Sequence, residues 1–179
     1  QRTQHRCVGK FQSWGFQVEW QMVWSGLNLW RFIRPVQDTS WLIAHGILPT
    51  ADRLIRFGMK VHPPCHCGNT ETLRHLFVEC PFAVRVLSWY IILLRHCAPP
   101  AAAPTPTQIL LGYGRNSGIP PVMQCLLGII RHQLWTARNE AQWEKVTPEL
   151  LLTTSKIKCS LRFTIRTEQR HCHAQKFSE

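Results

Sequence analysis

Hydrophobic side chains recur at three- and four-residue intervals along most of the chain, which is the spacing of one face of an α-helix. One such segment starts at Pro81 and runs to about His96, and it is predicted to be the central core helix. A second helix is predicted from about Pro121 to Lys145, and a last one from the capping residue Thr147 onward. Strand-like alternation is weak, so the predicted fold class is mainly α.

Tryptophans are concentrated in the first forty residues. Trp20 and Trp24 are four residues apart, so they can share one face of a helix. Pro35 is predicted to end this element. These rings could stack on nucleic-acid bases, but filling a core is the commoner use of such side chains.

Two short helices are expected next. Ser40 is a candidate cap for a helix over residues 41–45, and Thr50 for one over 51–57. Gly58 is predicted to end the second of them.

The central motif of the chain is Cys65-x-Cys67-x7-His75-x4-Cys80. Three thiolates and one imidazole can fill a tetrahedral zinc site. The first two cysteines lie on a tight turn flanked by proline and glycine, whereas the other two residues lie on a predicted short helix that Pro81 ends. Four ligands leave no open position, which predicts one structural zinc ion.

The local sequence supports a helix that carries the second half of this motif. Asn69 or Thr70 can cap it, and Glu71 would then lie in its first turn. His66 and, more weakly, His62 compete as ligands, although the sequence favours the interpretation that both are solvated residues of the turn. The plainer alternative is that the cysteines are ordinary small buried residues.

The surrounding sequence resembles the zinc-binding segment near the C-terminus of reverse transcriptases from non-LTR (LINE-type) retrotransposons. The similarity is close over residues 41–89, in the runs WLIAHGILPTADRLIRFG and CHCGNTETLRHLFVECPFAVRVLSW, and looser in RHQLWTARNEAQW. The residues that carry it are Leu48, Pro49, Thr50, Cys65, Cys67, Gly68, Glu71, Thr72, His75, Leu76, Phe77, Cys80 and Pro81. One departure is that a single residue separates Cys65 from Cys67, where many relatives have two or three.

These observations divide the chain into four predicted segments. They are a Trp-rich helical lead-in (1–40), a reverse-transcriptase-type zinc-binding domain (41–97), a linker rich in proline and glycine (98–120), and C-terminal helices with a basic stripe (121–179). The predicted architecture is therefore a small helical domain around the zinc-binding turn, followed by a linker and a C-terminal helical pair.

The charge balance suggests a polyanionic partner. The chain has 21 Lys and Arg against 10 Asp and Glu, a net charge of +11, and a pI near 9.8. RNA or DNA is expected before a membrane, and the residue pattern does not choose between the two nucleic acids. The residues expected to contact phosphate are Arg53, Arg56, Lys60, Arg74, Lys158, Arg162, Arg166 and Arg170.

The last four of these residues recur every four positions, about 6 Å apart by helix rise, which is close to the spacing of successive phosphates. An ordinary solvated helix face is the alternative interpretation.

The acidic residues exclude polymerase chemistry within this chain. Reverse transcription needs paired aspartates that hold two magnesium ions. The chain has only two aspartates, Asp38 and Asp52, and they belong to no acidic motif. We therefore expect no enzyme activity, although the chain could be a fragment of an RNA-directed DNA polymerase polyprotein.

Scattered cysteines and the absence of a signal-peptide pattern favour a reducing compartment, nuclear or cytoplasmic, over secretion. The resemblance implies a non-catalytic module that binds RNA or DNA, template or target, beside a polymerase domain. The alternative is a structural or protein-interaction fragment, a remnant or a co-opted piece, without nucleic-acid activity of its own.

Overall fold

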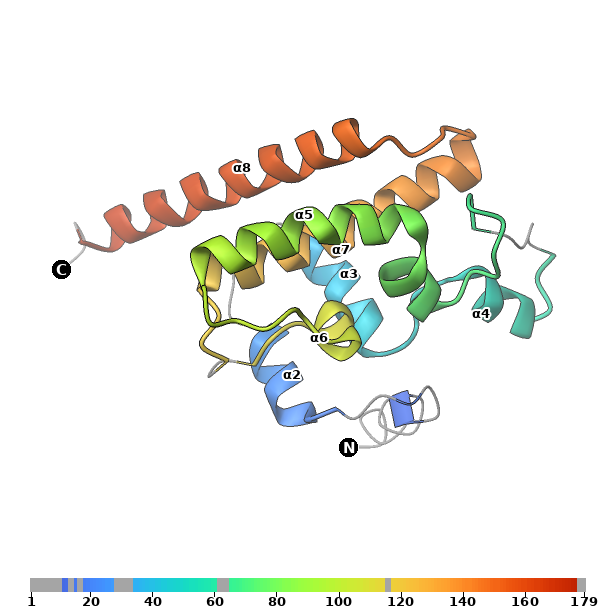
Figure 1. The fold of residues 1–179 in the computed structure, drawn as a ribbon, viewed down its shortest axis with the longest axis horizontal. Helices are drawn as coiled ribbons and strands as arrows, with labels where there is room; N and C mark the ends of the chain where they lie inside the picture. The colour runs from blue at the N-terminus through green and yellow to red at the C-terminus, as the bar shows by residue number, and fades with distance from the viewer. Residues whose placement is uncertain are drawn as a thin grey trace.

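The computed structural model describes most of the chain as helices joined by turns and longer loops (Figure 1). The described residues are 11, 12, 15, 18–27, 34–60, 65–114 and 117–176, with side chains described up to residue 170 except at 25–27. In chain order the elements are α2 (Trp20–Leu27), α3 (Arg34–Ala44), α4 (Ala51–Arg56), the π-helical turn η1 (His75–Glu79), α5 (Pro81–Cys97), α6 (Pro106–Leu111), α7 (Pro121–Asn139), the π-helical turn η2 (Glu140–Glu144) and α8 (Leu150–Lys176). No strand occurs within these ranges, and the mainly helical fold class is confirmed.

Helix α7 lies at the centre of the core. It packs against α3, α5 and α8, and it buries eleven residues, whereas α5 buries six. The prediction placed α5 in the central position, but α7 is the helix that is covered from several sides. The predicted bounds of α5 are confirmed, and its inward face carries Val86, Tyr90 and Leu94 at four-residue spacing.

Helix α8 covers one side of this core and reaches beyond it. It packs against α5 and α7, and its C-terminal end extends past the other helices (Figure 1). Its packed face carries Thr153, Ile157 and Thr164. Ile165 is 38% exposed, because the packed face lies on its neighbour Thr164 instead. The helix begins at Leu150, slightly later than the sequence predicts.

Helix α3 is longer than predicted and begins earlier. Pro35 lies in its first turn rather than at the end of the preceding element, because a fixed φ and a missing N–H are tolerated at a helix start. Ser40, predicted as a helix cap, is therefore buried in the middle of α3. Trp20 and Trp24 do share a face of α2, with ring centroids 5.6 Å apart in a stacked arrangement.

The segment 98–120, interpreted from the sequence as a linker rich in proline and glycine, contains a helix. Thr105 and Gln108 form a reciprocal capping box at the start of α6, and Pro106 occupies its first turn. Helix α6 packs against α3 and η1 and buries Ile109, Leu110 and Leu111. Its three apolar residues fill the core, which proline content alone did not reveal.

Arg131 on α7 is buried without a carboxylate partner in the described part of the chain. Its Nη1 donates to the carbonyl of Ile109 at 3.3 Å, and its Nη2 to the Ser40 hydroxyl at 3.4 Å. No described group accepts from its Nε. Burial lowers the pKa of this guanidinium to about 10, which indicates an environment that disfavours its charge.

We predict that Arg131→Met changes the free energy of unfolding by less than about 1 kcal/mol, or raises it. Methionine fills a similar volume, and the cost of burying an unpaired charge disappears. Urea unfolding followed by circular dichroism measures the difference. A loss of more than about 3 kcal/mol would mean that the two long hydrogen bonds outweigh the desolvation of the charge.

Candidate metal centre

A tight turn holds the first two cysteines of the motif. The amide of Gly68 donates to the carbonyl of Cys65 at 2.7 Å, and the amide of Cys65 donates to the carbonyl of Asn69 at 2.8 Å. Gly68 has a φ of +88°, a conformation that other residues rarely adopt. The Asn69 side-chain amide also donates to Cys67 Sγ at 3.5 Å. The turn therefore presents both sulfurs toward the helix that follows.

The π-helical turn η1 brings His75 and Cys80 to the same side. The amide of Cys80 donates to the carbonyl of His75 at 2.7 Å, an i→i+5 bond. Residues five apart, such as His75 and Cys80, are therefore about one turn apart and can face the same side. In an ordinary α-helix they would point in different directions. Pro81 then starts α5 at once.

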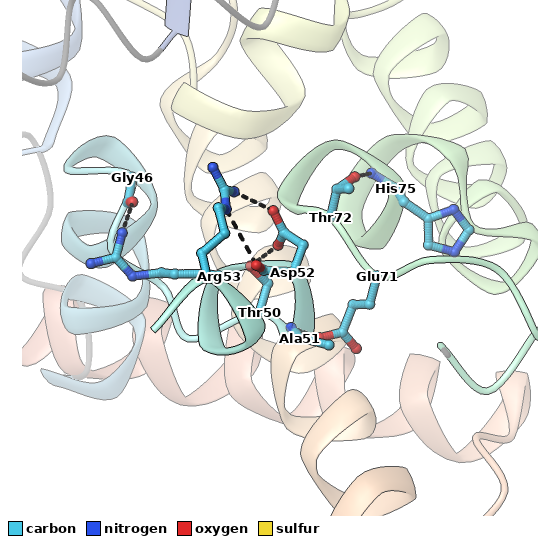
Figure 2. Close-up of polar contacts among 9 residues, drawn as sticks. Gly46, Thr50, Ala51, Asp52, Arg53, Glu71, Thr72 and His75 are labelled. Carbon is cyan, nitrogen blue, oxygen red and sulfur yellow. Dashed lines mark hydrogen bonds and ion pairs between the residues drawn. The ribbon is translucent and has the colours of Figure 1, made fainter. Parts of the chain in front are cut away.

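The start of this helical segment differs from the prediction. Thr72, not Asn69 or Thr70, caps it, since its hydroxyl accepts from the amide of His75 at 3.0 Å (Figure 2). Glu71 therefore precedes the helix instead of lying in its first turn, and its side chain is buried.

The four ligand atoms of Cys65, Cys67, His75 and Cys80 lie within 4.8 Å of one another. The sulfurs of Cys65 and Cys80 are 3.7 Å apart, and Cys67 Sγ is 3.2 Å from His75 Nε2. A tetrahedral zinc ion with Zn–S bonds of about 2.3 Å holds two sulfurs about 3.8 Å apart. This cluster could therefore hold one zinc ion.

The contact between the buried thiols of Cys65 and Cys80 shifts their pKa values in opposite directions. The hydrogen bond from Cys65 lowers the pKa of the Cys80 thiol to about 3, and the amides of Phe82 and Ala83 in the first turn of α5 also lower it. The same contact raises the pKa of Cys65. A thiolate at a helix start, next to a thiol that a metal cation can deprotonate, suits a zinc site.

His66 lies closer to the sulfurs than a freely solvated residue would. Its ring is exposed, yet Nδ1 is 3.4 Å from Cys65 Sγ and Nε2 is 3.8 Å from Cys80 Sγ. The ring also meets Phe82 edge-on at 5.6 Å. It therefore remains a competing ligand beside the four-residue cluster, whereas His62 lies outside the described residues.

A buried ion pair ties this site to the C-terminal half of the chain. Glu71 accepts from Arg138 on α7 through two hydrogen bonds, Nη2 to Oε1 at 2.6 Å and Nε to Oε2 at 2.7 Å. Both side chains are less than 5% exposed. Glu71 Oε1 also accepts from the amide of Ala51, the first residue of α4, at 2.9 Å (Figure 2). One carboxylate thus joins three segments of the chain.

Several polar side chains of α4 have hydrogen-bond partners within the helix or in the segment just before it (Figure 2). Arg56 pairs with Asp52, whose carboxylate also accepts from the Thr50 hydroxyl at 2.6 Å. Arg53 donates to the carbonyl of Gly46 at 2.9 Å. Thr50 is the N-cap residue as predicted, although its hydroxyl does not bond to the helix backbone.

The basic residues expected to contact phosphate fall into two sets in the structure. In the set near the metal centre, three of the four side chains already have partners within the chain. Arg53 and Arg56 have the contacts above, and Arg74 pairs with Glu79 at 2.6 Å. Lys60 is exposed. The other set, Lys158, Arg162, Arg166 and Arg170, lies on the exposed face of α8.

Comparison with known proteins gives one match. Residues 11–87 match the family described as zinc-binding in reverse transcriptase. The matched segment contains all four candidate zinc ligands and ends within α5, before α6, α7 and α8. Neither the curated proteins nor the solved structures contain a match. The match supports the predicted resemblance at the level of the zinc-binding segment.

The ion pair between Glu71 and Arg138 could not be predicted from the sequence. The two residues are 67 positions apart, and although each lies in a run that carries the resemblance, nothing in the sequence pairs them. Burial of a charged pair depends on how α7 packs against the zinc-binding segment, and only the structure reveals that packing.

We predict that the purified chain binds about one zinc ion, and that Cys80→Ser loses it. Removal of the ion by a chelator should lower the thermal midpoint, because metal binding contributes directly to folding. Zinc analysis and thermal circular dichroism test both points. Cys97→Ser, which changes an exposed cysteine outside the cluster, is the matched control and should keep the ion.

We predict that Arg138→Met lowers the free energy of unfolding by about 3–5 kcal/mol, since it leaves the Glu71 carboxylate buried and unpaired. The double variant Glu71→Met/Arg138→Met should lose much less than the sum of the two single variants. The exposed pair offers a control, and Arg74→Gln should cost at most about 1 kcal/mol. Additive losses in urea unfolding would show that the ion pair is not a coupled unit.

Proposed function

We propose that this chain is a non-catalytic zinc module that binds RNA or DNA beside the polymerase domain of a reverse transcriptase. Cys65, Cys67, His75 and Cys80 would hold one structural zinc ion, which fixes the turn and η1 in place. The single observation that carries the zinc assignment is the mutual approach of these four ligand atoms within 4.8 Å. A reducing compartment, nuclear or cytoplasmic, belongs to this proposal because the ligands must remain thiolates.

The exposed face of α8 supports the nucleic-acid part of the proposal. Arg162, Arg166 and Arg170 follow one another along this face, and none forms an ion pair with a described residue. Lys158 continues the row and lies over the Trp89 ring at 5.9 Å. A row of cations on a helix that extends beyond the core can approach a phosphate backbone without steric hindrance from other helices (Figure 1).

A second function, packing on a partner polypeptide, is favoured by exposed apolar side chains. Leu151 is 81% exposed, Ile92 67% and Phe163 60%. Large apolar side chains in contact with water are typical of surfaces that another protein covers. In this alternative the chain would act as a structural fragment without nucleic-acid activity of its own.

We predict that binding to a single-stranded RNA or a DNA duplex weakens steeply with salt, because each phosphate contact releases counterions. Arg162→Gln/Arg166→Gln should reduce the slope of log K against log salt by about 1.4–1.8, from roughly 0.7–0.9 for each contact. Fluorescence anisotropy at several salt concentrations measures the slope.

The matched control is Arg85→Gln/Arg95→Gln, which removes the same charge from exposed positions on α5. An equal change in both double variants would mean that net charge, not the α8 row, governs binding. Binding that ignores ionic strength would contradict the nucleic-acid proposal and leave the packing function.

A further inference from the structure

A cleft of about 430 Å³ lies between α3 and the end of α7 with η2. Its volume is in the range of ligand sites, and it is separate from the metal cluster and from the basic row on α8. The residues that give it chemical character are Asp38, Leu42, Trp135, Glu140, Trp143 and Glu144. Neither the zinc site nor the proposed nucleic-acid surface uses any of them.

Two tryptophans form the aromatic part of the cleft. Trp135 is partly buried beneath the Arg138 guanidinium, which lies 5.0 Å from its ring. Trp143, in contrast, is 65% exposed although it belongs to the cleft. Indole is the best of the aromatic rings for attracting a cation to its face. The exposed ring therefore has capacity for a ligand.

The backbone at Trp143 departs from ordinary helix geometry. Residues 140–144 form the π-helical turn η2, and Lys145 has a φ of +58° that ends it. Single π turns are frequent at functional sites, and a non-glycine residue with positive φ is uncommon. This geometry places Trp143 and Glu144 at the rim of the cleft, where both side chains are exposed.

The charge of the cleft is opposite to that of the chain. Glu140 pairs with Lys156 at 2.7 Å, whereas Asp38 and Glu144 form no ion pair with a described residue. None of the residues lining the cleft is lysine or arginine, and the nearby Lys145 ammonium donates to the carbonyl of Gln142. On a chain of net charge +11, this cleft is locally acidic.

His132, the histidine that lines the cleft, adds no positive charge. His132 lies 2.9 Å from the Thr39 hydroxyl through Nδ1, and that hydroxyl donates to the carbonyl of Pro35 at 2.8 Å. The hydroxyl proton is therefore used, so His132 Nδ1 carries a proton and donates. Burial lowers the pKa of His132, which keeps the ring neutral near pH 7.

We propose that this cleft binds a lysine or arginine side chain from a basic peptide segment of a protein partner. The cation would lie against Trp143, with the carboxylates of Asp38 and Glu144 beside it, while the aliphatic stem of the side chain packs on Leu42. A phosphate backbone is disfavoured here by the same two carboxylates. The chain then has two surfaces of opposite charge preference, one for a polyanion on α8 and one for a cationic segment in the cleft.

The test uses the full zinc-loaded chain and a hexa-arginine peptide, with binding followed by tryptophan fluorescence and calorimetry. We expect one peptide per chain. Trp143→Ala and, separately, Asp38→Asn/Glu144→Gln should each weaken binding about tenfold. Both changes alter exposed side chains, so the circular dichroism spectrum and zinc content should stay unchanged.

Matched controls are Trp41→Ala, which removes another exposed tryptophan, and Glu149→Gln, which removes an exposed carboxylate outside the cleft. Each should bind the peptide within about twofold of the parent chain. Equal weakening in the controls and the cleft variants would overturn the proposal, as would equal binding of a hexa-glutamate peptide.

Discussion

The buried pair of Glu71 and Arg138 is the interaction on which the arrangement of the chain depends. Glu71 lies directly before the segment that carries His75 and Cys80, and it also receives the first amide of α4. A buried carboxylate needs a complete set of partners, and Arg138 supplies two of them from α7. The position of the metal cluster is thereby tied to the most buried helix of the core.

The two π-helical turns, η1 and η2, each change the direction of a side chain relative to a regular α-helix. At η1 the wider turn lets residues five apart, His75 and Cys80, face one metal site. At η2 it ends α7 with an exposed indole at the edge of a cleft. In both places an extra residue per turn costs regular helix geometry and re-aims a side chain. The departures from ideal helix thus coincide with the sites to which we assign function.

Much of the helical architecture and all of the metal cluster could be predicted from the sequence, because both depend on local spacing. The helix of Pro81 to Cys97 follows from its apolar period, and the cluster follows from four residues within sixteen positions. The rest depends on packing between distant segments. Pro35 starts a helix instead of ending one, and α6 is buried within an apparent linker, because tertiary contacts outweigh local propensity.

The ion pair at Glu71 also limits how far the zinc-binding segment can be treated as autonomous. A fragment that stops after α5 would retain every metal ligand and the whole region that matches the reverse-transcriptase zinc-binding family. It would nevertheless expose the apolar surface that α7 covers and leave a carboxylate without its guanidinium. The smallest unit that neutralises its own buried charge extends through α7, so transplanting the metal motif into another protein requires that helix as well.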